Sequence, residues 1–373
     1  MDVSPLNYKL TFEPDLKKFT FNGLESISIN CKKSVNVITM NCAELKIKSC
    51  IVKSGKKIIK SFPKTNEKKE ELQIKLAEKI RGLCTVDLEF EGILNDRLLG
   101  FYRSRYEQNG KTKYLATTQF EAADARRAFP CWDEPEAKAT FEISIIADNQ
   151  FTAISNMPVK TKKKTGKTTL YNFQKTPLVS TYLIYLGVGE FEYLSGKAGK
   201  IQIRVVTTKG NTSKGKFSLE LGKKLLTSYE KYFGIKFPLP KLDLIAVPDF
   251  AAGAMENWGA ITFRETILLY DPKTSSTRTK QFIAEVISHE IAHMWFGNLV
   301  TMKWWNDLWL NESFATFMAT KFVDKFYPEW DLWNQFVEDA MNVAMGLDSL
   351  KTTHPIDVKV NSPAEIREIF DAI

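Results

Sequence analysis

The chain has 373 residues, of which 44% are hydrophobic and 26% charged, and its formal net charge is +8. This balance is typical of a globular protein, and the length predicts two domains. No apolar run is long enough to span a bilayer, and the N-terminus lacks the basic and apolar regions of a signal peptide. We therefore expect a cytoplasmic protein with no membrane partner.

Lysines cluster in two stretches, at residues 53–79 and 160–167. Glutamates are mixed into the first stretch, and the second has the composition of an exposed hairpin tip. Neither alternates basic with aromatic residues, as a surface that stacks nucleic-acid bases does. The positive charge therefore predicts solvated surface and no nucleic-acid partner.

Five cysteines occur in the first third of the chain, and none forms a CxxC pair. Their odd number and their spacing argue against a zinc ribbon and against a disulfide framework. We predict buried free thiols. The residues are Cys31, Cys42, Cys50, Cys84 and Cys131.

Residues 1–190 are predicted to form an antiparallel β-sandwich or saddle-shaped domain. Segments 26–29, 86–90 and 141–145 alternate apolar and polar residues, which is the period of a half-buried strand. Predicted turns punctuate such runs at Asn22-Gly23, Ser54-Gly55 and Thr165-Gly166.

Residues 191–373 mix helical and extended patterns, so the fold class is a multi-domain α+β protein. Apolar residues recur at helical spacing from Phe217 to Tyr229, and Gly234 provides a stop. Extended segments are predicted at 242–247 and 253–263. Helices are predicted over about 279–297, 307–327 and 330–347, and a further one begins at Ser362-Pro363.

The strongest local motif is His289-Glu290-Ile291-Ala292-His293. On a helix, the two histidines lie on one face and can both reach a single Zn²⁺, while Glu290 can contact a water at the metal. Only three histidines occur in the chain, which argues against a chance match. We predict His289 and His293 as metal ligands and Glu290 as the general base.

A catalytic zinc usually has three protein ligands, and the third is predicted to be Glu312, on the following helix. The aromatic and aliphatic neighbours of Glu312 predict that this helix is largely buried, and a buried carboxylate is stabilised by a cation. Asn311 and Thr316 either orient a ligand or serve in helix packing and capping. One Zn²⁺ per chain is expected.

Residues 253–257, Gly-Ala-Met-Glu-Asn, precede the zinc helix. An extended segment of small residues can pair with a peptide backbone as an added strand, and a carboxylate on it can receive a free α-ammonium group. The same five residues are also compatible with an ordinary loop.

Together, residues 118–135, 253–260, 289–293, 295–302 and 304–312 resemble the gluzincin aminopeptidases, which include the aminopeptidase N, puromycin-sensitive and archaeal tricorn-interacting factor types. The resemblance implies a saddle-like β domain followed by a thermolysin-like catalytic domain over residues 191–373. It implies that Glu256, helped by Glu121, binds the substrate amine and that Gln119 lines the first side-chain pocket. Gly253 and Ala254 would hold the peptide backbone, alongside Met255 and Asn257.

The implied activity is hydrolysis of the N-terminal residue from peptides with a free N-terminus. The family places an oxyanion-stabilising tyrosine shortly after a stretch like residues 369–373, where this sequence stops. We therefore expect a partial catalytic domain of reduced activity, whose partner is the missing C-terminal portion of the same enzyme.

Two other functions remain open. An epoxide hydrolase related to leukotriene A4 hydrolase resembles the same family, but that branch carries glutamine at the position of Glu121. A non-catalytic peptide-binding fragment is the alternative from a different class. The sequence does not indicate the preferred N-terminal residue or the oligomeric state.

Overall fold

The computed structural model describes residues 1–366, and these residues divide into two compact units. The first unit comprises Met1–Phe191 together with Pro248–Ala251. The second comprises Glu192–Val247 and the described residues from Ala252 onward. The predicted segment 369–373 lies outside the described residues.

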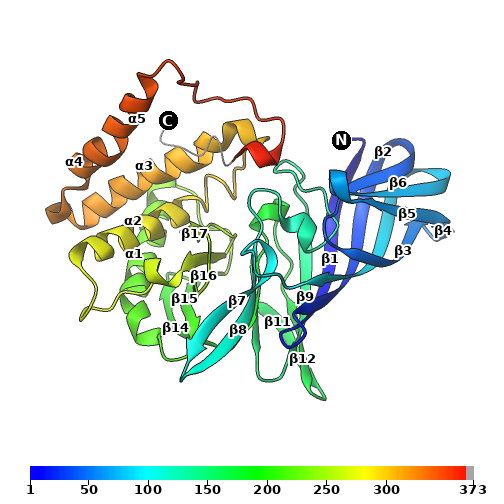
Figure 1. The fold of residues 1–373 in the computed structure, drawn as a ribbon, viewed down its shortest axis with the longest axis horizontal. Helices are drawn as coiled ribbons and strands as arrows, with labels where there is room; N and C mark the ends of the chain where they lie inside the picture. The colour runs from blue at the N-terminus through cyan, green and yellow to red at the C-terminus, as the bar shows by residue number, and fades with distance from the viewer. Residues whose placement is uncertain (367–373) are drawn as a thin grey trace. The chain divides into compact units, whose positions relative to one another are not determined.

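Two β-sheets make up the first unit (Figure 1). The larger has the strand order β11-β12-β9-β1-β2-β6-β3-β4, with β5 paired to β6, and the smaller has the order β10-β13-β8-β7. The strands of the larger sheet are β1 Val3–Asp15, β2 Thr20–Asn41, β3 Lys46–Ser54, β4 Lys57–Ile59, β5 Ser61–Asn66, β6 Glu71–Ile93, β9 Thr140–Asp148, β11 Val159–Thr165 and β12 Thr168–Phe173. Those of the smaller sheet are β7 Gly100–Gln108, β8 Lys111–Gln119, β10 Thr152–Ser155 and β13 Leu186–Gly189.

Aromatic side chains from both sheets form the core of this unit. The ring of Phe101, on β7, lies 5.9 Å from that of Phe12, on β1, and 5.1 Å from that of Phe21, on β2. Such pairs add about 0.5–1.5 kcal/mol each to the area that they bury. The predicted sandwich is therefore confirmed, and it is antiparallel apart from the parallel pairing of β1 with β9.

One of the three predicted turns is wrong. Asn22 and Gly23 lie inside β2, in register with Glu91 and Phe90 of β6. A Cβ atom on Gly23 would lie 2.2 Å from the ring of Phe90, so the glycine makes room for an aromatic side chain rather than bending the chain. The other two predictions are confirmed, because β3 ends at Ser54 and β11 ends at Thr165.

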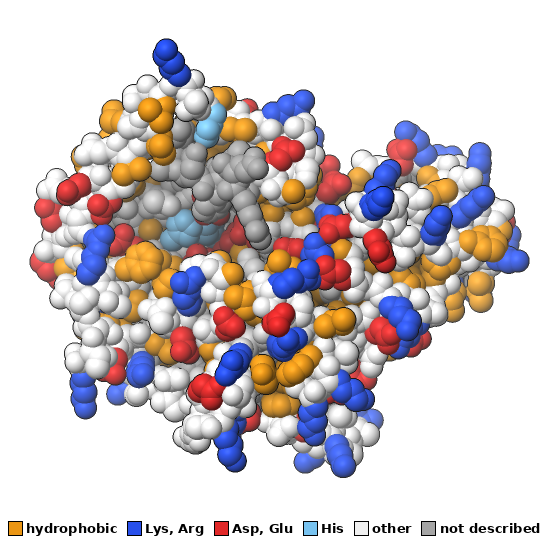
Figure 2. Space-filling model, in the orientation of Figure 1, with side chains coloured by type: hydrophobic (Ala, Val, Ile, Leu, Met, Phe, Trp, Pro, Cys, Tyr) orange, Lys and Arg blue, Asp and Glu red, His pale blue; other side chains and the backbone are white. Residues whose placement is uncertain are grey.

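The second lysine-rich stretch forms most of β11, the terminal strand of the larger sheet. Every residue of β11 is exposed. Lysines on an edge strand discourage pairing with another chain, because the charges would have to be desolvated. Figure 2 shows Lys and Arg side chains scattered over the face in view, with acidic side chains between them.

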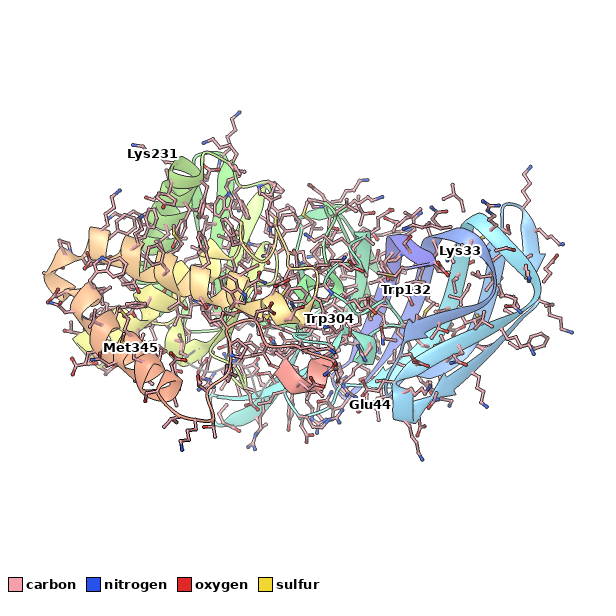
Figure 3. All side chains as sticks on the ribbon, turned by 90° about the horizontal axis from the view of Figure 1, so that it is seen from above. Lys33, Glu44, Trp132, Lys231, Trp304 and Met345 are labelled. Carbon is pink, nitrogen blue, oxygen red and sulfur yellow. The ribbon has the colours of Figure 1, made fainter. Side chains whose placement is uncertain are left out.

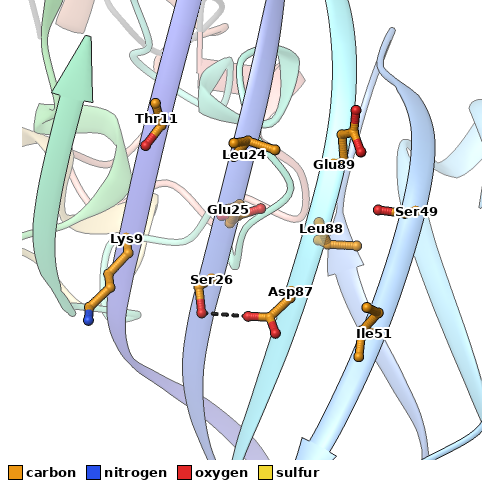
Figure 4. Close-up of a pocket in the computed structure, with 10 residues that line it drawn as sticks. All are labelled: Lys9, Thr11, Leu24, Glu25, Ser26, Ser49, Ile51, Asp87, Leu88 and Glu89. Carbon is orange, nitrogen blue, oxygen red and sulfur yellow. Dashed lines mark hydrogen bonds between the residues drawn. The ribbon is translucent and has the colours of Figure 1, made fainter. Parts of the chain in front are cut away.

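A shallow depression of about 340 Å³ lies on the larger sheet, across strands β1, β2, β3 and β6 (Figure 4). Ser26 donates a hydrogen bond to Asp87 there, at 2.6 Å. The neighbouring Glu25 also contributes to the lining, although strand alternation leaves this residue only 4% exposed. The lining residues are Lys9, Thr11, Leu24, Glu25, Ser26, Ser49, Ile51, Asp87, Leu88 and Glu89.

The second unit contains a five-stranded sheet in the order β14-β15-β16-β18-β17, together with helices α1 to α5. β15 and β16 are parallel, as are β16 and β18, whereas β17 is antiparallel to β18. The strands are β14 Phe191–Ala198, β15 Ile201–Thr208, β16 Lys241–Val247, β17 Ala254–Met255 and β18 Ala260–Arg264. The helices are α1 Lys216–Phe233, α2 Thr277–Ala292, α3 Leu308–Phe326, α4 Leu332–Phe336 and α5 Asn342–Asp348.

The third predicted long helix is present, with a π-helical turn at Val337–Met341 between α4 and α5. This part of the unit is exposed on several sides; Met345, labelled in Figure 3, is 65% exposed. The segment that follows returns to the loop before α3, where the Trp304 indole donates to the Val360 carbonyl at 2.7 Å. Ser362 accepts a bond from the Ala364 amide and caps the short 3-10 turn Pro363–Glu365.

All five cysteines are free thiols, as predicted, and four of them are buried. Cys50 is half-buried. Among residues 1–366, no helix combines the length and the apolar character needed to cross a membrane.

Candidate metal centre and peptide-binding strand

Helix α2 presents the two histidines and ends sooner than predicted. Its last helical residue is Ala292 and His293 is the C-cap, whereas the sequence predicted helix as far as Gly297. Gly297 has φ = +129°, a conformation that other residues rarely adopt, so the chain turns away there. The turn matters for the site because it brings the carbonyl of Phe296 to the ring of His293.

Each histidine is oriented through its Nδ1 atom. His293 Nδ1 lies 3.0 Å from the Phe296 carbonyl oxygen, which can only accept a hydrogen bond, so Nδ1 carries the proton. His289 Nδ1 lies 3.2 Å from the Thr316 hydroxyl on α3. Hydrogen bonds at Nδ1 leave the Nε2 lone pairs free for a metal, which is how metal-binding histidines are usually held.

Three ligand atoms converge on one point. His289 Nε2 and His293 Nε2 are 2.9 Å apart, and Glu312 Oε2 lies 3.2 Å from the first and 3.6 Å from the second. A tetrahedral zinc with bonds of about 2.0–2.1 Å separates its ligands by about 3.3 Å. The donor set and its spacing therefore fit Zn²⁺, with room for a fourth, non-protein ligand.

The charges around this point also favour a cation. Burial raises the pKa of the Glu290 carboxyl well above its usual range and also raises that of Glu256, although His293 opposes both shifts. Burial would lower the pKa of His293, but Glu256 and Glu312 outweigh it and raise that pKa well above its usual value. Burial likewise opposes ionisation of Glu312, yet His293 and His289 lower its pKa. Three carboxyl groups thus share one buried region with two imidazoles, and a bound divalent cation would stabilise the ionised forms of these carboxyl groups.

Two of these carboxyl groups have an uncommitted oxygen. Among the described residues, Glu290 Oε2 and Glu256 Oε1 are buried and have no hydrogen-bond partner. Unpaired buried carboxylate oxygens are costly, and a bound ion, water or ligand is one way in which native structures satisfy them. Glu290 lies on α2 between the histidines, and Glu256 follows β17.

The segment Gly253–Asn257 forms an edge strand and its continuation. Ala254 and Met255 pair with Phe263 and Thr262 of β18, and β17 is the last strand in the sheet order. Gly253 is exposed and Ala254 half-buried, whereas Met255, Glu256 and Asn257 are buried. An edge strand with small, accessible residues can accept a peptide as a further strand.

A buried ionic cluster supports the residues that follow this segment. Lys241, on β16, donates to Asp243 and to the Gly259 carbonyl, both at 2.7 Å. Arg204 makes two bonds of 2.6 Å to the same aspartate. Burial lowers the pKa of Lys241 to about 8, although Asp243 acts in the opposite direction.

Gln119 and Glu121 belong to the first unit. Gln119 is the last residue of β8 and is 8% exposed, and its Oε1 atom has no hydrogen-bond partner among the described residues. Glu121 is half-buried in the turn that follows. Their assigned places in a substrate pocket remain predictions from the resemblance.

Sequence reasoning overlooked two residues that hold the centre together. The Tyr229 hydroxyl on α1 lies 2.8 Å from the Ser288 hydroxyl on α2 and donates to the Met318 carbonyl on α3 at 3.2 Å, so one side chain joins three helices beside His289. The buried side chain of Asn298 donates to the Glu256 carbonyl at 2.8 Å. Only the helical spacing of Tyr229 and the turn-forming character of Asn298 are visible in the sequence.

Two predictions about α3 need adjustment. Trp309 and Phe317 are 40% and 42% exposed, so this helix is buried on one side only. The Glu312 side chain is 19% exposed, since it lies near the boundary between the two faces. Of the two candidate orienting residues, Thr316 contacts His289, and Asn311 is buried beside Gly297.

An α+β fold that brings a His₂Glu donor set together with an uncommitted glutamate is the arrangement of a metal-dependent hydrolase. The peptidase family M1 domain matches residues 217–373, and the peptidase M1 N-terminal domain matches residues 4–183. The chain therefore belongs to peptidase family M1.

Similar proteins are aminopeptidases. Aminopeptidase M1 from Arabidopsis thaliana is 45% identical over 99% of this chain and 43% of its own length. Aminopeptidase 2, mitochondrial, from Saccharomyces cerevisiae is 45% identical, and puromycin-sensitive aminopeptidase from Caenorhabditis elegans is 44% identical, each over 100% of this chain and 40% of its own length. The chain thus spans about two fifths of the length of these curated relatives.

Proposed function

We propose that this chain contains the zinc site and the amine-binding carboxylate of an aminopeptidase, which removes the N-terminal residue from peptides. The observation that carries the proposal is the convergence of His289 Nε2, His293 Nε2 and Glu312 Oε2 beside Glu290. The resemblance of the whole chain to aminopeptidases supports the substrate class.

His289, His293 and Glu312 would hold the metal. When bound, Zn²⁺ polarises the scissile carbonyl and acidifies water. Glu290 accepts a proton from the water whose oxygen attacks the carbonyl carbon, and delivers that proton to the nitrogen of the leaving amine as the C–N bond breaks. This role needs a carboxylate without a competing partner, and the uncommitted Oε2 of Glu290 meets that requirement.

Glu256 would select for a free N-terminus. Its buried carboxyl group can accept hydrogen bonds from an α-ammonium group, and an acetylated amine carries no charge to offer it. The accessible edge of β17 would pair with the substrate backbone and direct the first peptide bond toward the metal. We also propose that the part of the relatives' length that this chain does not span supplies the oxyanion donor.

The test is to compare hydrolysis of a free aminoacyl anilide with that of its N-acetylated twin by the zinc-loaded chain. We expect cleavage of the free substrate alone, lost on chelation and restored by Zn²⁺. Equal cleavage of both substrates would contradict amine recognition. A zinc-loaded chain that binds the free substrate without cleaving it would instead favour a non-catalytic peptide-binding fragment.

A further inference from the structure

Asn298 connects the two functional parts of the candidate site. Its side-chain amide nitrogen donates to the Glu256 main-chain carbonyl at 2.8 Å, and its backbone amide donates to the His293 carbonyl at 3.0 Å. Residue 298 therefore contacts the metal-ligand histidine through its backbone and the amine-binding segment through its side chain. Asn298 itself is fully buried.

The loop that carries Asn298 is held by several short hydrogen bonds. The Gly297 amide donates to the Val300 carbonyl at 2.7 Å, and the Val300 amide donates to the Trp295 carbonyl at 2.9 Å. The Thr301 hydroxyl donates to the Gly297 carbonyl at 2.5 Å and approaches the Asn298 carbonyl at 3.2 Å. A loop fixed in this way has few alternative conformations, so it can hold Asn298 at a defined position.

The segment that accepts this hydrogen bond, residues 255–257, is also held in place, by contacts at each of its two ends. Met255 is paired with Thr262 of β18, and the Asn257 side chain donates to the Thr262 hydroxyl at 3.1 Å. Those contacts tie Glu256 to the sheet rather than to α2. Among the described hydrogen bonds, the one from Asn298 joins the Glu256 backbone to the end of the metal-binding helix.

We propose that Asn298 is a positioning residue for amine recognition, because it fixes the main chain at Glu256 relative to His293 and so sets the spacing between the amine-binding carboxylate and the metal. That spacing decides which peptide bond reaches the metal when the α-ammonium group is bound to Glu256. A misplacement of about 1 Å at such a site reduces its function strongly. This inference rests on the proposed function of Glu256.

The test uses two probes that differ only in the amine: alanine hydroxamate and propionohydroxamate. Both carry the metal-binding hydroxamate, so the ratio of their affinities for the zinc-loaded chain reports amine recognition without requiring turnover. We expect the wild-type chain to bind the amino probe about 10–100-fold more tightly. Glu256→Ala should abolish that ratio.

Two Asn298 variants distinguish the effect of losing the hydrogen bond from the effect of losing side-chain packing. Asn298→Leu keeps the approximate side-chain volume but removes the donor, and Asn298→Ala removes both. We expect each to lower the ratio about tenfold through weaker binding of the amino probe, with zinc content and propionohydroxamate affinity unchanged. Val300→Ala is the matched control, because this side chain lies in the same loop and is 62% exposed.

The outcomes distinguish the two proposals. If the wild-type chain does not discriminate between the probes, or if Glu256→Ala leaves the ratio intact, the proposed role of Glu256 is wrong. If Glu256→Ala abolishes the ratio but both Asn298 variants preserve it, the positioning role is wrong. Loss of zinc, or an equal loss of affinity for both probes, in the Asn298 variants would also overturn it and assign Asn298 to stability alone.

Discussion

The two units of the chain both bury glutamate side chains, but their surroundings differ. In the first unit, Glu25 points into the aromatic and aliphatic core, and neither of its carboxyl oxygens has a hydrogen-bond partner among the described residues. Burial alone raises its pKa well above the usual range, which favours the neutral acid. In the second unit, Glu312 lies beside two imidazoles, and its pKa is lowered.

The comparison shows that burial of a carboxyl group does not by itself indicate a metal site. A buried carboxyl group is tolerated when it takes up a proton or when a cation lies next to it. For Glu25, burial favours uptake of a proton, since among residues 1–366 no charge of opposite sign lowers its pKa. Glu312 follows the second, and the converging nitrogens of His289 and His293 distinguish it. Replacing a glutamate by glutamine preserves the shape of the side chain but removes its charge. Such substitutions should therefore have different effects in the two environments.

The largest effect is expected for Glu290→Gln. The amide cannot accept the proton from water, so turnover of the free aminoacyl anilide should fall by about 10²–10⁴-fold while one zinc per chain is retained. Initial rates and metal analysis on the same preparations measure both quantities. Glu285→Gln, on the same helix and half-buried, is the control and should keep its activity. Normal turnover in Glu290→Gln would rule out the general-base role.

A smaller but still large effect is expected for Glu312→Gln. Loss of an anionic ligand should weaken zinc binding by more than the roughly 10–100-fold that loss of an orienting partner costs. Competition with a chromophoric chelator measures the affinity. Glu329→Gln, exposed in the turn after α3, should leave the affinity unchanged. Unaltered affinity in Glu312→Gln would remove this residue from the ligand set.

The smallest effect is expected for Glu25→Gln, and it appears in the pH dependence of unfolding. The folded-state pKa of Glu25 is raised, so the native state binds one proton more than the unfolded state between the unfolded pKa of about 4.5 and the folded pKa. In that window its contribution to the free energy of unfolding falls by up to about 1.4 kcal/mol for each pH unit of increase. In Glu25→Gln, the free energy of unfolding should lack this decrease with pH.

Urea unfolding at several pH values measures the slope for the wild type and the variant. Glu89→Gln, on the exposed face of β6, is the matched control for removing a carboxyl group from the same sheet. Parallel pH profiles for the wild type and Glu25→Gln would show that Glu25 is not protonated by burial.

Several features could be predicted because they depend on neighbours in the sequence. The spacing of His289 and His293 places both on one face of α2, and the alternation at residues 26–29 directs Ile27 and Ile29 into the core. Features that depend on distant partners were predicted poorly. Gly23 looks like a turn residue until the ring of Phe90, from another strand, occupies the space beside it.

The strand and helix periods, the membership of peptidase family M1 and the donors that a metal site would use could all be predicted from the order of the residues. How those donors meet depends on the packing of helices and loops. Helix α3 packs so that Glu312 reaches the two imidazoles, and the turn after α2 carries Asn298 to the carbonyl of Glu256. The physical reason is that periodicity is set by local backbone geometry, whereas the spacing between ligands is set by packing between segments far apart in the chain.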